Sequence, residues 1–190
     1  MTEAPVEAIV IGASAGAVQA LSLILPRLPV GYPLPVLVVV HVGDQPSELT
    51  NLFRAKCQVP VREPEDKEPI VPGTVYFAPA GYHMLVESDR SIALSMDEPV
   101  LYSRPSIDIL FESAADSYGA QLVGVVLTGA NEDGAMGART IFAAGGAMLV
   151  EDPTNAFAAT MPEAALKRCP AAKILTLDAI ADHLVGLGTT

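Results

Sequence analysis

The sequence is poor in cysteine, in histidine and in basic residues, and each shortage argues against a kind of site or partner. The 190 residues include two cysteines, Cys57 and Cys169, which are far apart and form no C-x-x-C pair. Free thiols in a reducing compartment are the simplest interpretation. The three histidines form no cluster with cysteine, so we expect no zinc site, no other metal and no cofactor.

Basic residues are outnumbered two to one, with 11 Lys and Arg against 22 Asp and Glu and a net charge of −11. This balance argues against a nucleic-acid partner, because such binding neutralises phosphates with Lys and Arg. No apolar run is long enough to cross a bilayer, and residues 1–5 lack the basic segment of a signal peptide. We therefore expect a cytoplasmic protein without membrane insertion.

What the sequence does contain is a short apolar run, residues 7–11, that enters a turn of small residues before a helical pattern over 18–25. Within this turn Ser14 stands between Gly12 and Gly16, which is the G-x-S-x-G spacing of a nucleophile elbow. Two other interpretations compete with a nucleophilic serine. Ser14 is also a favoured helix N-cap residue, and a glycine-bearing turn at a helix start is typical of phosphate binding in dinucleotide folds.

The next strand, residues 34–40, is a continuous apolar run followed at once by His41. Such runs are typical of strands buried on both faces of a parallel sheet. A dinucleotide-binding fold places Asp or Glu near this strand end, so His41 disfavours a nucleotide site. Because the carboxyl ends of neighbouring parallel strands lie side by side, we expect Ser14 and His41 to meet.

A third apolar strand, residues 121–127, runs into a turn that contains Asp133. Asp133 is either a helix cap or Asp-Gly turn residue, or the carboxylate that orients a histidine. Asn131 and Glu132 are polar neighbours that compete for the second role. Together the three junctions place Ser14, His41 and Asp133 at one sheet edge. The chain order Ser, His, Asp differs from that of α/β-hydrolases and indicates another fold family.

The rest of the chain alternates between strand and helix patterns, and we expect an α/β fold: a doubly wound, mainly parallel sheet with helices on both faces and a small β-hairpin insert. No repeat or linker divides the chain, so we expect one domain over residues 1–190. Further strands are predicted at 59–63, 74–78, 83–87, 92–94, 147–151 and 174–175, and helices at 104–118, 135–144, 162–167 and 177–187. His83 follows a hairpin turn and is expected to be structural.

Several short stretches, in the same order along the chain, resemble the catalytic domain of the CheB-type protein-glutamate methylesterases of bacterial chemotaxis. The matching stretches are Ile11–Gly16, similar to I-G-A-S-T-G, Val39–His41, Val75–Pro79, His83–Val86, Arg104–Asp108, similar to R-P-S-V-D, Leu127–Gly134, similar to L-T-G-M-G-x-D-G, and Met161–Ala165, similar to M-P-R-A-A.

The resemblance implies that Ser14, His41 and Asp133 are the nucleophile, the base and the orienting carboxylate of a serine hydrolase. The reaction would remove methyl esters from glutamate side chains on the cytoplasmic helices of chemoreceptors, and would also deamidate receptor glutamines. Around this triad we expect the backbone of Ala15, Gly129 and Ala130 to bind the oxyanion. Arg104 is a candidate for contact with the substrate peptide.

The chain departs from the family motifs near the triad, where Ala15 replaces threonine, Ala130 replaces methionine and Asn131 replaces glycine. These changes affect the expected rate and substrate preference rather than the chemical class. The family's full-length proteins begin with a receiver domain, and none is expected here. Regulation by a separate protein, constitutive activity and a fragment all stay open. A non-enzymatic binding module in a signalling complex is the alternative function, ahead of a nucleotide-binding protein.

Overall fold

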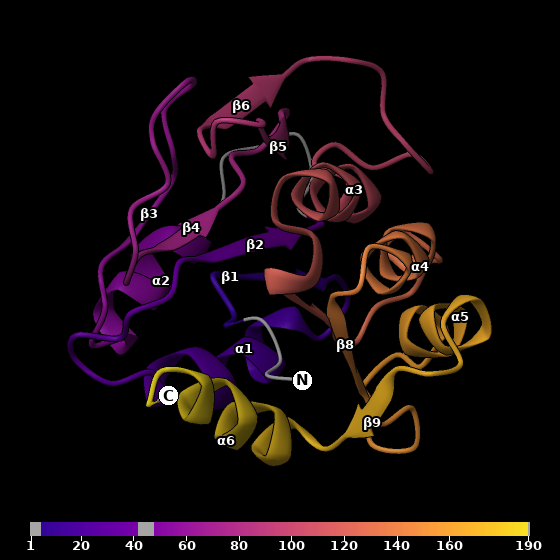
Figure 1. The fold of residues 1–190 in the computed structure, drawn as a ribbon. Coiled ribbons are helices and arrows are strands. Elements are labelled where there is room, and N and C mark those ends of the chain that lie inside the picture. The colour runs from indigo at the N-terminus through magenta and orange to yellow at the C-terminus, as the bar shows by residue number, and fades with distance from the viewer. Residues whose placement is uncertain (1–4, 42–47, 190) are drawn as a thin grey trace.

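The computed structural model describes residues 5–41 and 48–189, which form a seven-stranded parallel sheet. Figure 1 shows the sheet with helices packed on both of its faces. The strand order is β3-β4-β2-β1-β7-β8-β9. The strands are β1 (Ala8–Ala13), β2 (Val36–Val40), β3 (Val61–Arg62), β4 (Val75–Phe77), β7 (Leu122–Val126), β8 (Ala147–Glu151) and β9 (Lys173–Leu175).

The three central strands β2, β1 and β7 are the apolar runs that the sequence predicts as buried strands. All of their residues are buried, because helices cover both faces of the sheet. Gly12 of β1 pairs with Val39 of β2 on one side and with Val126 of β7 on the other. This register brings the carboxyl ends of the three strands level, so the turns that follow them share one edge.

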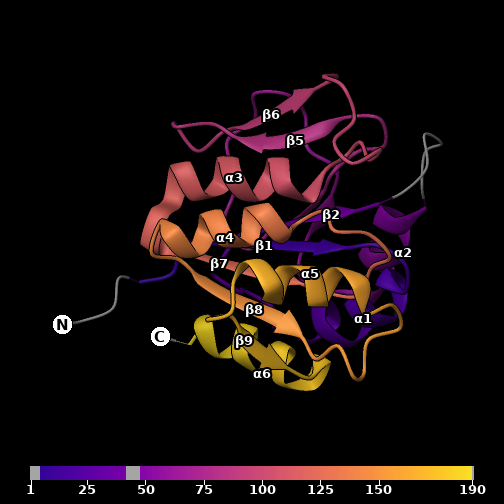
Figure 2. The same cartoon turned by 90° about the vertical axis from the view of Figure 1, so that its right-hand side faces the viewer.

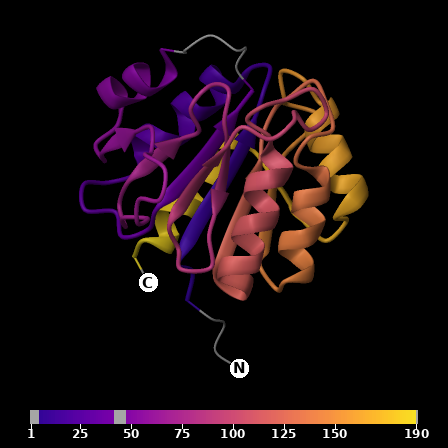
Figure 3. The same cartoon turned by 90° about the horizontal axis from the view of Figure 1, so that it is seen from above.

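Two hydrophobic cores lie on the opposite faces of the sheet. Helices α1 (Ala17–Ile24), α2 (Leu49–Lys56) and α6 (Leu177–Leu187) contribute buried residues to the first core. Helices α3 (Ile107–Tyr118), α4 (Ala135–Ala143) and α5 (Thr160–Arg168) contribute to the second and lie side by side (Figure 3). Short 3-10 helices span Leu25–Arg27 and Gly119–Gln121. The predicted doubly wound α/β fold is thus confirmed.

The predicted hairpin insert is also present, as an antiparallel pair formed by β5 (His83–Val86) and β6 (Ile92–Ser95). Figure 2 shows the hairpin lying over α3, at the outer side of the molecule. Its attachment includes a hydrogen bond of 3.0 Å from the backbone N–H of Val86 to the Ser113 hydroxyl. Within the described residues no helix is both long enough and apolar enough to span a membrane.

Two helices differ from the sequence prediction. Helix α2 was not predicted, because it is only eight residues long and Thr50 and Phe53 are its only buried residues. Helix α3 begins at Ile107 rather than at Arg104, since Ser106 is its N-cap residue with an extended backbone. The Ser106 hydroxyl accepts a hydrogen bond from the N–H of Ile109.

Candidate active site

Ser14 follows β1 directly, and hydrogen bonds of its backbone hold it in place. Its N–H donates to the carbonyl of Thr128 at 2.9 Å, and its own carbonyl accepts from the N–H of Ala17 at 2.9 Å. The N-cap residue of α1 is Gly16, with a φ of 86° and no side-chain cap, so Ser14 does not serve as the cap. Among the described residues the Ser14 hydroxyl has no hydrogen-bond partner, which leaves it free to meet a substrate.

His41 lies at the end of β2 next to the end of β1, because its N–H donates to the carbonyl of Ala13 at 3.1 Å. Its ring atom Nε2 is 2.7 Å from Oδ2 of Asp133, and the imidazole is about one-tenth exposed. The partner carboxylate is therefore Asp133 and not Glu132, as the sequence predicts. Ser14 and His41, which the sequence predicts to meet, form no direct hydrogen bond. Instead, Nδ1 of His41 faces the amide nitrogen of Asn131 at 3.4 Å.

Asp133 is fully buried and accepts four hydrogen bonds, three from the amino terminus of α3 and one from His41. Its Oδ2 accepts from Ile107 N–H at 2.6 Å and from His41, and its Oδ1 accepts from the Ser106 hydroxyl and Asp108 N–H, both at 2.9 Å. Burial alone would raise the pKa of Asp133, but the hydrogen bonds from His41 and from the backbone outweigh it and lower the pKa. Asp133 is thus an ionised acceptor, which requires a proton on Nε2 of His41.

Asp108 makes the reciprocal contact, from α3 to the amino terminus of α4. It lies in the first turn of α3, and its Oδ1 accepts from the N–H groups of Gly134 at 3.0 Å and Gly137 at 2.7 Å, where α4 begins. The amino terminus of α3 therefore receives the carboxylate of Asp133 from the turn before α4, and the amino terminus of α4 receives the carboxylate of Asp108 from α3; the helix dipole favours negative charge at both places. Burial raises the pKa of Asp108 to about 6, and the nearby charge of Asp133 acts in the same direction.

The raised pKa of Asp108 gives a pH-dependent stability. The ordinary pKa of this group is 3.8 and its folded value is about 6, so between these values the folded chain holds a proton that the unfolded chain has lost. The contribution of Asp108 to stability is therefore largest below about pH 4 and is lost as pH rises through about 6. Asp108→Asn retains an oxygen for both N–H groups, so we expect it to raise the free energy of unfolding at pH 7 by about 1–3 kcal/mol.

Urea unfolding of the Asp108→Asn variant and the original protein from pH 3.5 to 8 measures this difference. The two curves should converge at the acid end, where the aspartic acid is neutral. Asp116→Asn, an exposed change on the same helix, serves as the matched control. An original protein more stable than the Asp108→Asn variant at pH 7 would show that the charge of Asp108 stabilises the fold.

Only some of the backbone N–H groups that were expected to bind an oxyanion are free to do so. The N–H of Gly129 donates to the carbonyl of Ala158 at 3.0 Å, so Gly129 does not offer a free donor, contrary to expectation. The N–H groups of Ala15 and Ala130 have no hydrogen-bond acceptor among the described residues. The Thr128 hydroxyl donates to the carbonyl of Ala15 at 2.8 Å and accepts from Ala158 N–H at 2.8 Å. Thr128 therefore links the turn after β1, which contains Ala15, to the loop before α5, which contains Ala158.

Arg104 has a different partner from the expected substrate. Its Nη1 donates to the carbonyls of Met96 at 3.0 Å and Asp97 at 3.1 Å, so the guanidinium holds the loop between β6 and α3. Its Nε is buried and has no hydrogen-bond partner within residues 5–41 and 48–189. In this conformation Arg104 positions a loop near the start of α3 instead of offering Nη1 to a ligand.

His83 has the structural role that the sequence predicts. The ring is fully buried, Nδ1 accepts from the N–H of Ser106 at 3.1 Å, and Nε2 lies 3.0 Å from the carbonyl of Glu98. Both ring nitrogens are thus occupied by backbone groups, which leaves no free lone pair for a base. Ser106, which contacts both His83 and Asp133, was not selected by sequence reasoning, although a serine just before a helix was the available signal.

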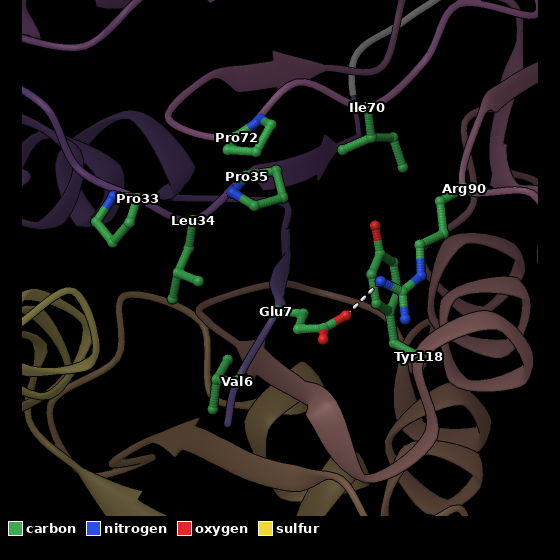
Figure 4. Close-up of a pocket in the computed structure, with 9 residues that line it drawn as sticks. All are labelled: Val6, Glu7, Pro33, Leu34, Pro35, Ile70, Pro72, Arg90 and Tyr118. Carbon is green, nitrogen blue, oxygen red and sulfur yellow. Dashed lines mark hydrogen bonds and ion pairs between the residues drawn. The ribbon is translucent and has the colours of Figure 1, made fainter. Parts of the chain in front are cut away.

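A cavity of about 290 Å³ lies at the other edge of the sheet, where the central strands begin. Figure 4 shows Glu7 and Arg90 paired across it. The Arg90 guanidinium lies 4.6 Å from the ring centre of Tyr118. The carboxylate of Glu7 and the guanidinium of Arg90 thus pair with each other. The cavity is separate from Ser14 and His41. Within the described residues no group of three or more His, Cys, Asp or Glu side chains is placed to hold a metal ion.

The fold and the residues gathered at the carboxyl edge of its sheet define an α/β enzyme of the hydrolase class. The chain belongs to the CheB methylesterase family, whose model matches residues 9–184. Its backbone is similar to the crystal structure of the CheB methylesterase catalytic domain from Thermotoga maritima, with a TM-score of 0.89 and 29% sequence identity. The match covers 97% of this chain and 100% of that one.

Two named relatives extend the comparison. A Leptospira interrogans protein, named provisionally a protein-glutamate methylesterase/protein-glutamine glutaminase, is 43% identical over 182 residues, 95% of this chain and 94% of its own length. A protein-glutamate methylesterase/protein-glutamine glutaminase from Carboxydothermus hydrogenoformans is 36% identical over 93% of this chain. This chain spans 54% of the length of that second relative.

Proposed function

We propose that this protein is a cytoplasmic serine hydrolase that removes methyl esters from glutamate side chains of chemoreceptors. The observation that carries the proposal is the buried carboxylate of Asp133, hydrogen-bonded to His41 at 2.7 Å at the sheet edge where the Ser14 hydroxyl has no partner among the described residues. If Asp133 only capped a helix, it would not require a hydrogen bond from the His41 ring. If the turn at Ser14 only bound a nucleotide, it would not require the serine hydroxyl. The names of the relatives supply the substrate class, a glutamyl ester on a protein.

In the proposed reaction Ser14 attacks the γ-carbonyl of the ester while Nδ1 of His41 takes the hydroxyl proton. The oxyanion that forms is stabilised by the N–H groups of Ala15 and Ala130. His41 then gives its proton to the leaving methoxide, methanol departs, and a glutamyl ester to Ser14 remains. Water, activated by His41, hydrolyses that ester to free glutamate and regenerates the serine. Asp133 stabilises the imidazolium in both halves of the reaction.

The same sequence of steps acts on an amide, with ammonia leaving in place of methanol. A glutaminase activity on receptor glutamines therefore needs no additional residue. The proposed substrates are the cytoplasmic helices of methylated chemoreceptors, and a separate regulatory protein is a candidate partner. We propose that residues 1–190 work as one domain, since both cores and the whole candidate site belong to one sheet.

The test is release of methanol from receptor-containing membranes that carry radiolabelled glutamyl methyl esters. We expect methanol to be released in step with the appearance of free glutamate, and no release from membranes whose receptors carry only glutamate. Binding to methylated receptors without release of methanol would instead support the binding-module alternative.

A further inference from the structure

Asn131 lies in the turn between β7 and α4, and its side chain contacts both members of the His41–Asp133 pair. Its Oδ1 accepts a hydrogen bond of 3.0 Å from the backbone N–H of Asp133. Because this donor requires the oxygen, the orientation of the amide is fixed by the turn. The amide nitrogen Nδ2 is then the group that faces Nδ1 of His41 at 3.4 Å.

The nitrogen that Asn131 faces is the one the reaction needs. Asp133 is an ionised acceptor, so Nε2 of His41 carries the ring proton and donates it to Oδ2. In the neutral imidazole Nδ1 therefore holds the lone pair, and this is the only lone pair of the ring that can accept the proton of Ser14. The amide N–H of Asn131 is directed at that same lone pair.

We propose that Asn131 is a positioning residue that restrains the catalytic group: it holds the free nitrogen of His41 in the substrate-free protein and keeps it from Ser14. In keeping with this contact, the Ser14 hydroxyl has no hydrogen-bond partner in the part of the chain that the structure describes. Once His41 accepts a proton, Nδ1 becomes a donor that faces the amide donor of Asn131, so the contact must break during the reaction. This inference rests on the proposed function for the role of His41 as the base.

This restraint depends on Asn131, a position at which this chain departs from the motif that it resembles. The motif that Leu127–Gly134 resembles carries glycine where Asn131 stands, and a glycine has no side chain to reach the imidazole. At 3.4 Å the contact is long for a hydrogen bond between neutral groups, so its loss changes a rate only modestly. A net strength typical of such bonds corresponds to an acceleration of about 2–10-fold when the side chain is removed.

The rate of covalent labelling of Ser14 by a fluorophosphonate tests this without any receptor. In that step a bond forms between Ser14 Oγ and phosphorus, the phosphorus–fluorine bond breaks, fluoride leaves, and the serine proton passes to Nδ1 of His41. We expect Asn131→Gly to label about 2–10-fold faster than the original protein. Asn131→Ser should behave alike, because a serine hydroxyl can accept from Asp133 N–H but is too short to reach His41.

The neighbouring change Glu132→Gln is the matched control, since Glu132 is exposed and its side chain has no hydrogen-bond partner among the described residues. It should label at the original rate. Ser14→Ala provides the background that is subtracted. Nitrogen-15 spectra add a readout that a merely structural role would not move: the Nδ1 resonance of His41 should shift in both Asn131 variants while Nε2 stays bonded to Asp133. With three histidines in the chain, His41→Ala assigns the signals.

Equal or slower labelling of both Asn131 variants would overturn the proposal, as would an original protein whose His41 carries its proton on Nδ1. Acceleration in Asn131→Gly alone would assign the effect to the backbone of the turn and also overturn it. Absence of Ser14 labelling in every variant would do the same, because a released base should activate the serine. If the proposed function fails but the role of Asn131 holds, Ser14 labels with the expected ratios and methylated receptors release no methanol.

Discussion

Replacement of Ser14 by alanine is expected to reduce methanol release by about 10⁴–10⁶-fold, the loss that follows removal of the nucleophile in other serine hydrolases. The same change should leave thermal unfolding unaltered, because the Ser14 hydroxyl has no hydrogen-bond partner among the described residues. Alanine also fits a turn that already contains Ala13 and Ala15. Radiolabelled methanol release, together with a thermal melt of each protein, measures both effects.

Ser22→Ala is the matched control for this prediction. Ser22 lies on α1, and its hydroxyl accepts a hydrogen bond from Lys56 at 3.0 Å, outside the candidate site. Its activity should equal that of the original protein. A Ser14→Ala protein that keeps a tenth or more of the original turnover would show that another group attacks the ester.

The central part of the fold could be predicted from the sequence because its signal is local. Strands β1, β2 and β7 are apolar runs buried on both faces, and parallel pairing then places the residues after them at one edge. Parallel pairing of these strands thus suffices to bring His41 to Asp133. Helix α2 was not predicted for the opposite reason, since its eight residues, of which two are buried, are fewer than the window of about 11–18 residues over which helical periodicity is judged.

Hydrogen bonds between segments distant in the sequence account for what could not be predicted about the site. Gly129 looks like a free donor in its own turn, and only the approach of Ala158 from the loop before α5 shows that its N–H is taken. The exchange of carboxylates between α3 and α4 likewise depends on how two helices pack. Asn131 was one of three polar residues in its turn, and nothing local distinguishes the one that faces Nδ1 of His41.

The second large effect is expected for Asp133→Asn, which should lower both activity and stability. Each oxygen of Asp133 accepts two hydrogen bonds, Oδ2 from His41 and Ile107 and Oδ1 from Ser106 and Asp108. Whichever way an asparagine faces, its NH₂ group meets at least one backbone N–H donor within 3 Å. We expect the free energy of unfolding to fall by about 2–4 kcal/mol, as for other buried charged groups that lose their hydrogen bonds.

The loss of activity in Asp133→Asn follows from the tautomer of His41. If the new amide donates to Nε2, the ring proton moves to Nδ1 and no lone pair is left for the proton of Ser14. A comparable exchange in a serine protease lowers turnover by about 10⁴-fold, and we expect a similar loss of methanol release here. Asp116→Asn, on the exposed side of α3, controls for removal of a negative charge and should change neither activity nor stability.

Activity and urea unfolding must be measured on the same preparations of Asp133→Asn, because its two effects have separate origins. Assays are made at a temperature where the variant is fully folded, so that the residual rate reports the imidazole and not the folded fraction. A folded Asp133→Asn protein with more than a tenth of the original turnover would show that Asp133 only joins α3 to the turn before α4. A turnover near zero in the folded variant requires that the carboxylate also orients His41 toward Ser14.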